Sequence, residues 1–100
     1  MKKKKLFYGY WLSCHDWAKD GTVYVSNSLK RLIQFFFKTA EENFEDGKPH
    51  QFTIHEEETG ERVFFARKWQ RFDRWCVVDV PGYFFNKPGL PEDKPNVIEI

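Results

Sequence analysis

The chain has 100 residues, of which 41% are apolar and 19% aromatic, and its formal net charge is +1. This length allows one domain with a single core and excludes a second domain. The apolar content excludes a disordered chain. The net charge is low for a generic nucleic-acid binder, but it is unevenly spread, because residues 32–60 are acidic and the segments on either side of them are basic.

The first residues combine a lysine cluster with an aromatic run, and this start superficially resembles a signal peptide. Gly9 and Trp11 interrupt the run, and no small-residue cleavage pattern follows it. No run approaches the ~18 apolar residues of a membrane span. We therefore expect mature chain, no membrane partner and a cytoplasmic location, where Cys14 and Cys76 stay reduced.

Strand-forming aromatic residues fill positions 6–14, and a second strand-like run covers positions 22–25. Asp20-Gly21, just before the second run, is typical of a two-residue hairpin turn. The connection also holds residues 13–17, Ser-Cys-His-Asp-Trp. A catalyst needs such groups to converge in space, and neighbouring residues rarely do so. We expect a turn here and no catalytic residue.

Residues 26–47 predict a long amphipathic helix, because apolar side chains recur every three or four positions. Ser26, Asn27 or Ser28 can cap its start, and Gly47 can end it. The predicted buried face comprises Leu29, Leu32, Ile33, Phe36, Phe37, Ala40 and Phe44. Acidic residues crowd the last turns, where the helix dipole disfavours them. They suggest an acidic surface that meets a basic partner, comprising Glu41, Glu42 and Glu45.

Residues 50–68 read as a hairpin and residues 72–80 as a further strand. The predicted fold is α+β: one small domain with an antiparallel sheet of about five strands in the order ββαβββ and one helix across one face. Four prolines after position 80 predict an extended tail. We expect residues 1–82 to form the core domain and residues 83–100 to pack on it or on a partner.

Alternation places Val63 and Phe65 on one face of the predicted sheet and Phe64 and Ala66 on the other. Both faces are therefore apolar, and one helix covers only one of them. The proline-rich tail, a second copy in a homodimer, or a different macromolecule could cover the other.

No spacing of cysteine or histidine resembles a metal site. His50 and His55 lie five apart on an extended strand and so face opposite sides, where we expect them near the surface. The scattered glycines form no phosphate-binding loop. The sequence predicts no metal and no cofactor.

The strongest functional signal is a basic and aromatic stretch, whose cations can pair with phosphates while its rings stack on bases. The same residues could equally be core rings with solvated charges. The candidate binding residues are Arg67, Lys68, Trp69, Arg71, Arg74 and Trp75.

We expect a non-catalytic protein-interaction module. Brevity and the lack of catalytic machinery suggest an accessory or inhibitor protein of the kind carried by phages and mobile elements. A nucleic-acid-binding module that uses the Arg/Trp hairpin and the lysine-rich start is the first alternative, and a small enzyme built around His15 is the second.

Overall fold

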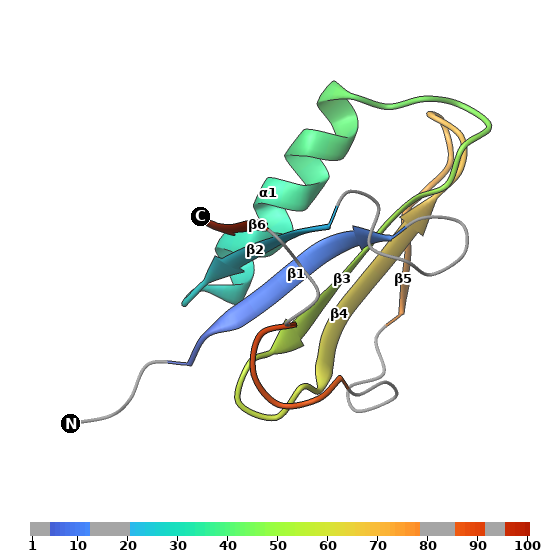
Figure 1. Ribbon diagram of the computed structural model, residues 1–100. Coiled ribbons are helices and arrows are strands. Elements are labelled where there is room, and N and C mark those ends of the chain that lie inside the picture. The colour runs from blue at the N-terminus through green and yellow to red at the C-terminus, as the bar shows by residue number, and fades with distance from the viewer. Residues whose placement is uncertain (1–4, 13–20, 79–85, 92–95) are drawn as a thin grey trace.

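The computed structural model describes residues 5–12, 21–78, 86–91 and 96–100. The predicted Ser-Cys-His-Asp-Trp turn, with His15, lies outside the described residues, as do positions 83–85 of the tail. One helix lies across one face of a sheet (Figure 1), which confirms the α+β class. The described elements are β1 (Phe7–Leu12), β2 (Thr22–Ser26), α1 (Leu29–Glu42), β3 (His50–Glu56), β4 (Arg62–Lys68), β5 (Cys76–Val78) and β6 (Asn96–Glu99).

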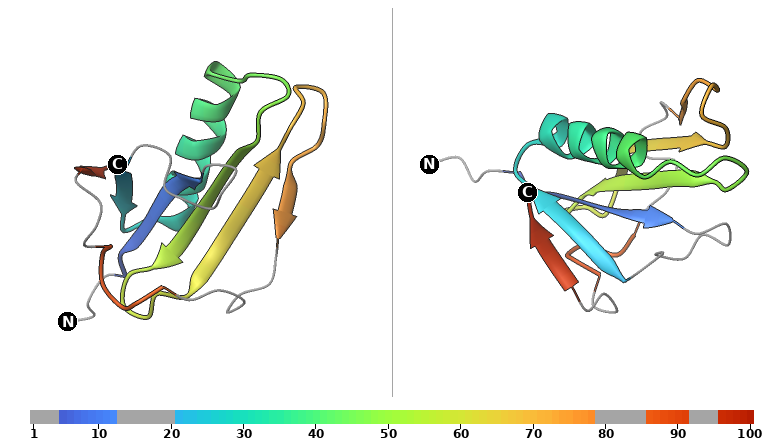
Figure 2. Two further views of the ribbon diagram at one scale, coloured as in Figure 1. Left: turned by 45° about the vertical axis from the view of Figure 1, so that its right-hand side comes forward. Right: turned by 90° about the horizontal axis from the view of Figure 1, so that it is seen from above.

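The six described strands form one sheet in the order β5-β4-β3-β1-β2-β6. The hairpin β1-β2 and the meander β3-β4-β5 are antiparallel, as predicted, and β3 joins them by pairing with β1. The sheet is nevertheless mixed, because β6 pairs in parallel with β2 (Figure 2). The sequence did not predict β6, because it is a short run that follows several prolines and its strand signal is weak. It lies at an edge of the sheet, where nearby prolines are tolerated.

The helix begins where the sequence predicts and ends earlier. Ser28 caps it, since its hydroxyl oxygen accepts a hydrogen bond from the backbone N–H of Arg31 (3.2 Å). The helix ends at Glu42, not near Gly47, because the Asn43 side chain donates to the Thr39 carbonyl oxygen (3.0 Å). Asn, which readily hydrogen-bonds to nearby backbone, here replaces the expected glycine stop.

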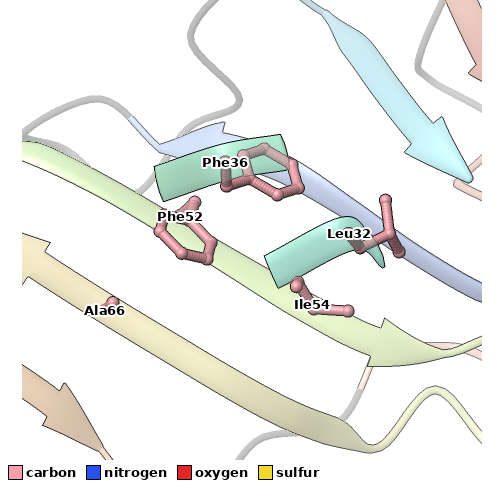
Figure 3. Close-up of a cluster of buried hydrophobic side chains, with 5 residues drawn as sticks. All are labelled: Leu32, Phe36, Phe52, Ile54 and Ala66. Atoms are coloured by element: carbon pink, nitrogen blue, oxygen red, sulfur yellow. The ribbon is translucent and has the colours of Figure 1, made fainter. Parts of the chain in front are cut away.

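The main core lies between α1 and the sheet, and aromatic rings fill it (Figure 3). Phe36 stacks on Phe52 with ring centroids 4.7 Å apart. A side chain at Gly9 would meet Phe36 at 2.8 Å, so glycine at this strand position lets the helix approach closely. The buried members of this cluster are Leu32, Phe36, Phe52, Ile54 and Ala66.

Strict alternation fails in β4, and the prediction that Val63 and Phe65 lie on the same face of the sheet is wrong. The register of β3 and β4 shifts between Ile54 and His55, as at a β-bulge. Both Val63 and Phe64 consequently pack on the helix-side core. Phe65 lies on the opposite face, beneath the Arg62 guanidinium at 4.7 Å.

The face away from the helix, which we call the far face, differs from the prediction of an apolar surface. Its buried apolar residues include the cluster of Tyr8, Val23 and Val25, on β1 and β2. On the neighbouring β3, alternate residues are polar and also buried, namely Gln51, Thr53 and His55. The far face therefore depends on hydrogen bonds as well as on packing.

Candidate functional site

The loop between β4 and β5, residues 69–75, carries the most exposed large apolar side chain of the described residues, and we call it the Phe72 loop. The Phe72 side chain is 96% exposed and Trp69 is 46% exposed. Burying a phenylalanine side chain is worth about 1.5–3 kcal/mol. An aromatic side chain left in water on a folded domain is therefore a candidate contact for a partner.

The Phe72 loop is held by hydrogen bonds to itself and to the segment after α1. The Gln70 N–H donates to the Asp73 carboxylate (3.1 Å), and the Asp73 N–H donates to the Gln70 carbonyl oxygen (3.0 Å). The Gly47 N–H donates to the Trp69 carbonyl oxygen (3.1 Å), and Asp46 accepts from the Arg71 backbone. Phe72 is thus presented on a backbone that is already ordered.

Two of the predicted binding residues serve the fold. Lys68 is buried, its ammonium lies 3.5 Å from the Glu41 carboxylate, and it faces the Phe44 and Trp75 rings. Trp75 packs edge-on against Phe37, with ring centroids 5.0 Å apart. The buried Lys68 is not accessible to a partner, whereas Trp75 packs on the helix and stays half-buried.

The other cations of the predicted patch differ in whether the fold uses their side chains. The Arg71 guanidinium donates to the Phe44 carbonyl oxygen (3.3 Å) and so braces the loop. Arg67 and Arg74 are exposed. Together with Trp69 and Phe72, these two arginines form the accessible part of the predicted basic and aromatic patch.

The predicted acidic helix end lies against this patch and does not form a separate surface. Glu41 pairs with Lys68, Glu45 pairs with Lys48 at 2.7 Å, and Glu42 is exposed. The hydrogen bond to Glu45 raises the pKa of Lys48, although an exposed pair of this kind adds little stability. The structure brings the two sequence-predicted patches together as one surface of mixed charge.

His55, expected near the surface, is 1% exposed on the far face. The two histidines do face opposite sides, as predicted, since His50 stacks on Phe44 at 4.4 Å and lies on the helix side. His55 pairs in register with Tyr8, and the two rings stack 5.4 Å apart, with the Tyr10 ring 6.1 Å from His55. The bulge after Ile54 places His55 beneath the β3-β4 turn, which shields it from water.

Hydrogen bonds around His55 fix the tautomer of its neutral ring. Its Nδ1 lies 3.0 Å from the Gly60 carbonyl oxygen, which can only accept, so Nδ1 carries the proton. Its Nε2 then accepts from the Thr53 hydroxyl (2.9 Å), and that hydroxyl oxygen accepts from Arg62 Nε (3.0 Å). Burial lowers the pKa of His55 to about 4, the Arg62 charge adds to this effect, and the Gly60 hydrogen bond opposes it.

A segment of the proline-rich tail, residues 86–91, is fastened over this network, and we call it the strap. The Asn86 side-chain amide donates to the Tyr8 hydroxyl (3.0 Å) and the Tyr10 hydroxyl (3.3 Å). The Asn86 N–H donates to the Gly60 carbonyl oxygen (2.7 Å), and Leu90 packs on the apolar cluster of the far face. Burial raises the pKa of Tyr8, which stays protonated at neutral pH.

Sequence reasoning missed the His55 network. One signal was present, because Gln51, Thr53 and His55 alternate with apolar residues along β3 and so share a face. The partners that satisfy them come from the β3-β4 turn and from Asn86, and no local pattern links these segments.

In the described part of the chain, no group of three or more histidine, cysteine, aspartate or glutamate residues could hold a metal ion. The helix that the structure describes is too short and too polar to cross a membrane. No family model, no curated protein and no solved structure matches this chain.

Proposed function

We propose that this chain is a non-catalytic protein-binding module that docks through the Phe72 loop. The observation that carries the proposal is the almost complete exposure of Phe72 on a loop braced by its own hydrogen bonds. A braced loop loses little conformational entropy on binding, so more of the free energy of burying the ring contributes to affinity. By covering a partner's surface, such a module would act as an accessory or inhibitory protein.

The residues around Phe72 suit a protein interface. Aromatic and arginine side chains carry a large share of the binding energy in protein complexes. Trp69, Phe72 and the exposed Arg67 and Arg74 provide both kinds beside each other. The complementary partner would offer an apolar pocket for Phe72, with carboxylates at its rim.

Nucleic acid is the second candidate, because exposed Trp69 and Phe72 could stack on bases while Arg67 and Arg74 pair with phosphates. Charge favours the protein partner. Asp73 lies in the loop itself, and Glu41, Glu42 and Asp46 lie beside it. A phosphate backbone needs a row of accessible cations, and Lys68 in this patch is already paired with Glu41.

The test replaces Phe72 with the photo-crosslinker p-benzoylphenylalanine in the full chain, expressed in its native host. The matched control carries the crosslinker at Gln34, which is exposed on the helix. We expect a discrete protein adduct from position 72 and none from position 34. If the adducts disappear on nuclease treatment and binding weakens steeply with salt, the partner is nucleic acid instead. Equal adducts from both positions would contradict a site at the Phe72 loop.

A further inference from the structure

We infer that the partner adds an extended strand, with alternating acidic and apolar residues, to the free edge of β5 next to the Phe72 loop. The inference rests on the proposed function and specifies what kind of segment the partner presents. The inferred site is at β5, one of the two outermost strands of the described sheet, which pairs with β4 on one side. Among the described residues no strand pairs with its other side.

The edge of β5 lacks most of the usual protections. Natural edge strands discourage pairing with proline, bulges or inward-pointing charges. Cys76-Val77-Val78 contains no proline and no charge, and Cys76 and Val77 are exposed. Shortness is the one protection that the described residues give it. The strand begins directly after the Phe72 loop, so a segment that contacts Phe72 can continue along the β5 edge.

The arginines beside this edge select an acidic segment. Arg67 pairs in register with Cys76 and alternates with the buried Ala66 and Lys68, so it projects from the far face. A strand added to β5 would lie two strand spacings from β4, about 9.6 Å. A long arginine side chain can reach across the small Cys76 toward a glutamate at that distance. Arg74, exposed two residues before Cys76, lies near the same path.

The opposite face of β5 selects apolar residues for the alternate positions. Val77 pairs with Ala66 and is 43% exposed, which leaves apolar surface for a cross-strand neighbour. A second copy of this chain does not supply such a segment through its own β5, because Cys76-Val77-Val78 contains no acidic residue.

The experiment uses a synthetic peptide of alternating Glu and Val, ~8 residues long as in a typical strand. It is titrated into the full isotope-labelled chain at low ionic strength, where charge effects are largest. We expect amide shifts confined to β5 and the Phe72 loop. A peptide of the same composition, with all Val before all Glu, should bind at least about tenfold more weakly.

A charge exchange tests the arginines. The double variant Arg67→Glu, Arg74→Glu should lose about tenfold in affinity for the Glu/Val peptide and recover binding to the matching Lys/Val peptide. The control Arg31→Glu changes an exposed arginine on the helix and should leave the affinity unchanged.

Three results would overturn the inference. The peptide with all Val before all Glu could bind as tightly as the alternating Glu/Val peptide, the double variant could fail to bind the Lys/Val peptide, or the alternating Glu/Val peptide could fail to bind the wild type. If any of these occurs while the crosslinker at position 72 still captures a protein, strand addition is wrong and the protein-binding proposal stands. If the crosslinker at position 72 captures no protein, the proposed function is wrong, whatever the peptide titrations show.

Discussion

The two faces of the sheet are built on different physical principles. On the helix side, rings such as Phe36 and Phe52 fill space, and burial of apolar area supplies the stability. On the far face, the His55 ring and the Thr53 hydroxyl are buried with their hydrogen-bonding groups satisfied. The stability of the helix side therefore depends on the volume of its buried side chains. The stability of the far face depends on the protonation state of a buried histidine.

The largest effect is expected on the helix side. Phe36→Ala removes a fully buried ring that contacts Trp11, Tyr24 and Phe52, and should lower the free energy of unfolding by about 3–5 kcal/mol. Urea denaturation measures it. The control Phe72→Ala, at an exposed position, should change stability by less than about 0.5 kcal/mol. Similar losses for the two variants would contradict the assignment of the core.

The next effect concerns pH and the far face. The ordinary pKa of histidine is 6.5, and that of His55 in the folded chain is about 4. Between these values the unfolded chain binds a proton that the folded chain does not, so stability should fall as the pH drops from 6.5 to 4. The loss amounts to about 3 kcal/mol.

Urea denaturation of the wild type and of His55→Gln across this pH range checks the second prediction. Carboxylates titrate in both proteins, so the difference between the two curves isolates the histidine. We expect that difference to change steadily between pH 6.5 and 4. Parallel curves would show that His55 is not held neutral by the fold.

The smallest effect concerns the strap. A Cβ atom at Gly60 would lie 2.0 Å from the Asn86 carbonyl oxygen, whereas one at Gly47 would meet nothing within 4 Å. Both glycines have positive φ, so both changes to alanine carry backbone strain. Gly60→Ala should additionally release the strap and cost about 1–2 kcal/mol more than Gly47→Ala, through lost hydrogen bonds.

Hydrogen exchange at the Gly89 N–H reads the strap directly, since this group donates to the Glu57 carbonyl oxygen at 2.7 Å. Exchange should accelerate in Gly60→Ala and stay slow in Gly47→Ala. An unchanged rate in both variants would mean that the strap is held elsewhere.

The sequence predicted those parts of the fold that depend on local periodicity. The helix start at Ser28 followed from its cap, and the β3-β4 hairpin followed from turn residues and alternation. The strands β1 and β2 were predicted from their composition, but β1 ends at Leu12 and β2 begins at Thr22, so a two-residue Asp20-Gly21 turn does not join them.

The helix end depended on a local hydrogen bond of the Asn43 side chain, which glycine-based reasoning overlooked. The bulge after Ile54 and the pairing of β6 with β2 depended on contacts between separate segments. These contacts leave no local pattern in a single sequence.

The candidate site was predicted in composition and not in arrangement. The stretch around Phe72 predicted a binding patch, because arginine and aromatic side chains interleave there. Their division into the buried Lys68 and the exposed Arg67 and Trp69 follows from the register of β4 and the position of the helix end. The proximity of the acidic and basic patches is likewise a tertiary property, since the Lys68–Glu41 contact joins a strand to the helix.

The bond between Asn86 and Tyr8 joins residues 78 positions apart, and this separation bears on how the chain folds. Contacts between distant positions form late, because closing a long loop costs entropy before any contact compensates for it. The hairpins and the helix side can assemble from neighbouring segments. The strap is held by contacts between distant positions, so an opened form in which it is detached would expose Tyr8, Val23 and Val25 to solvent. That opened form, rather than the native domain, is where aggregation would begin.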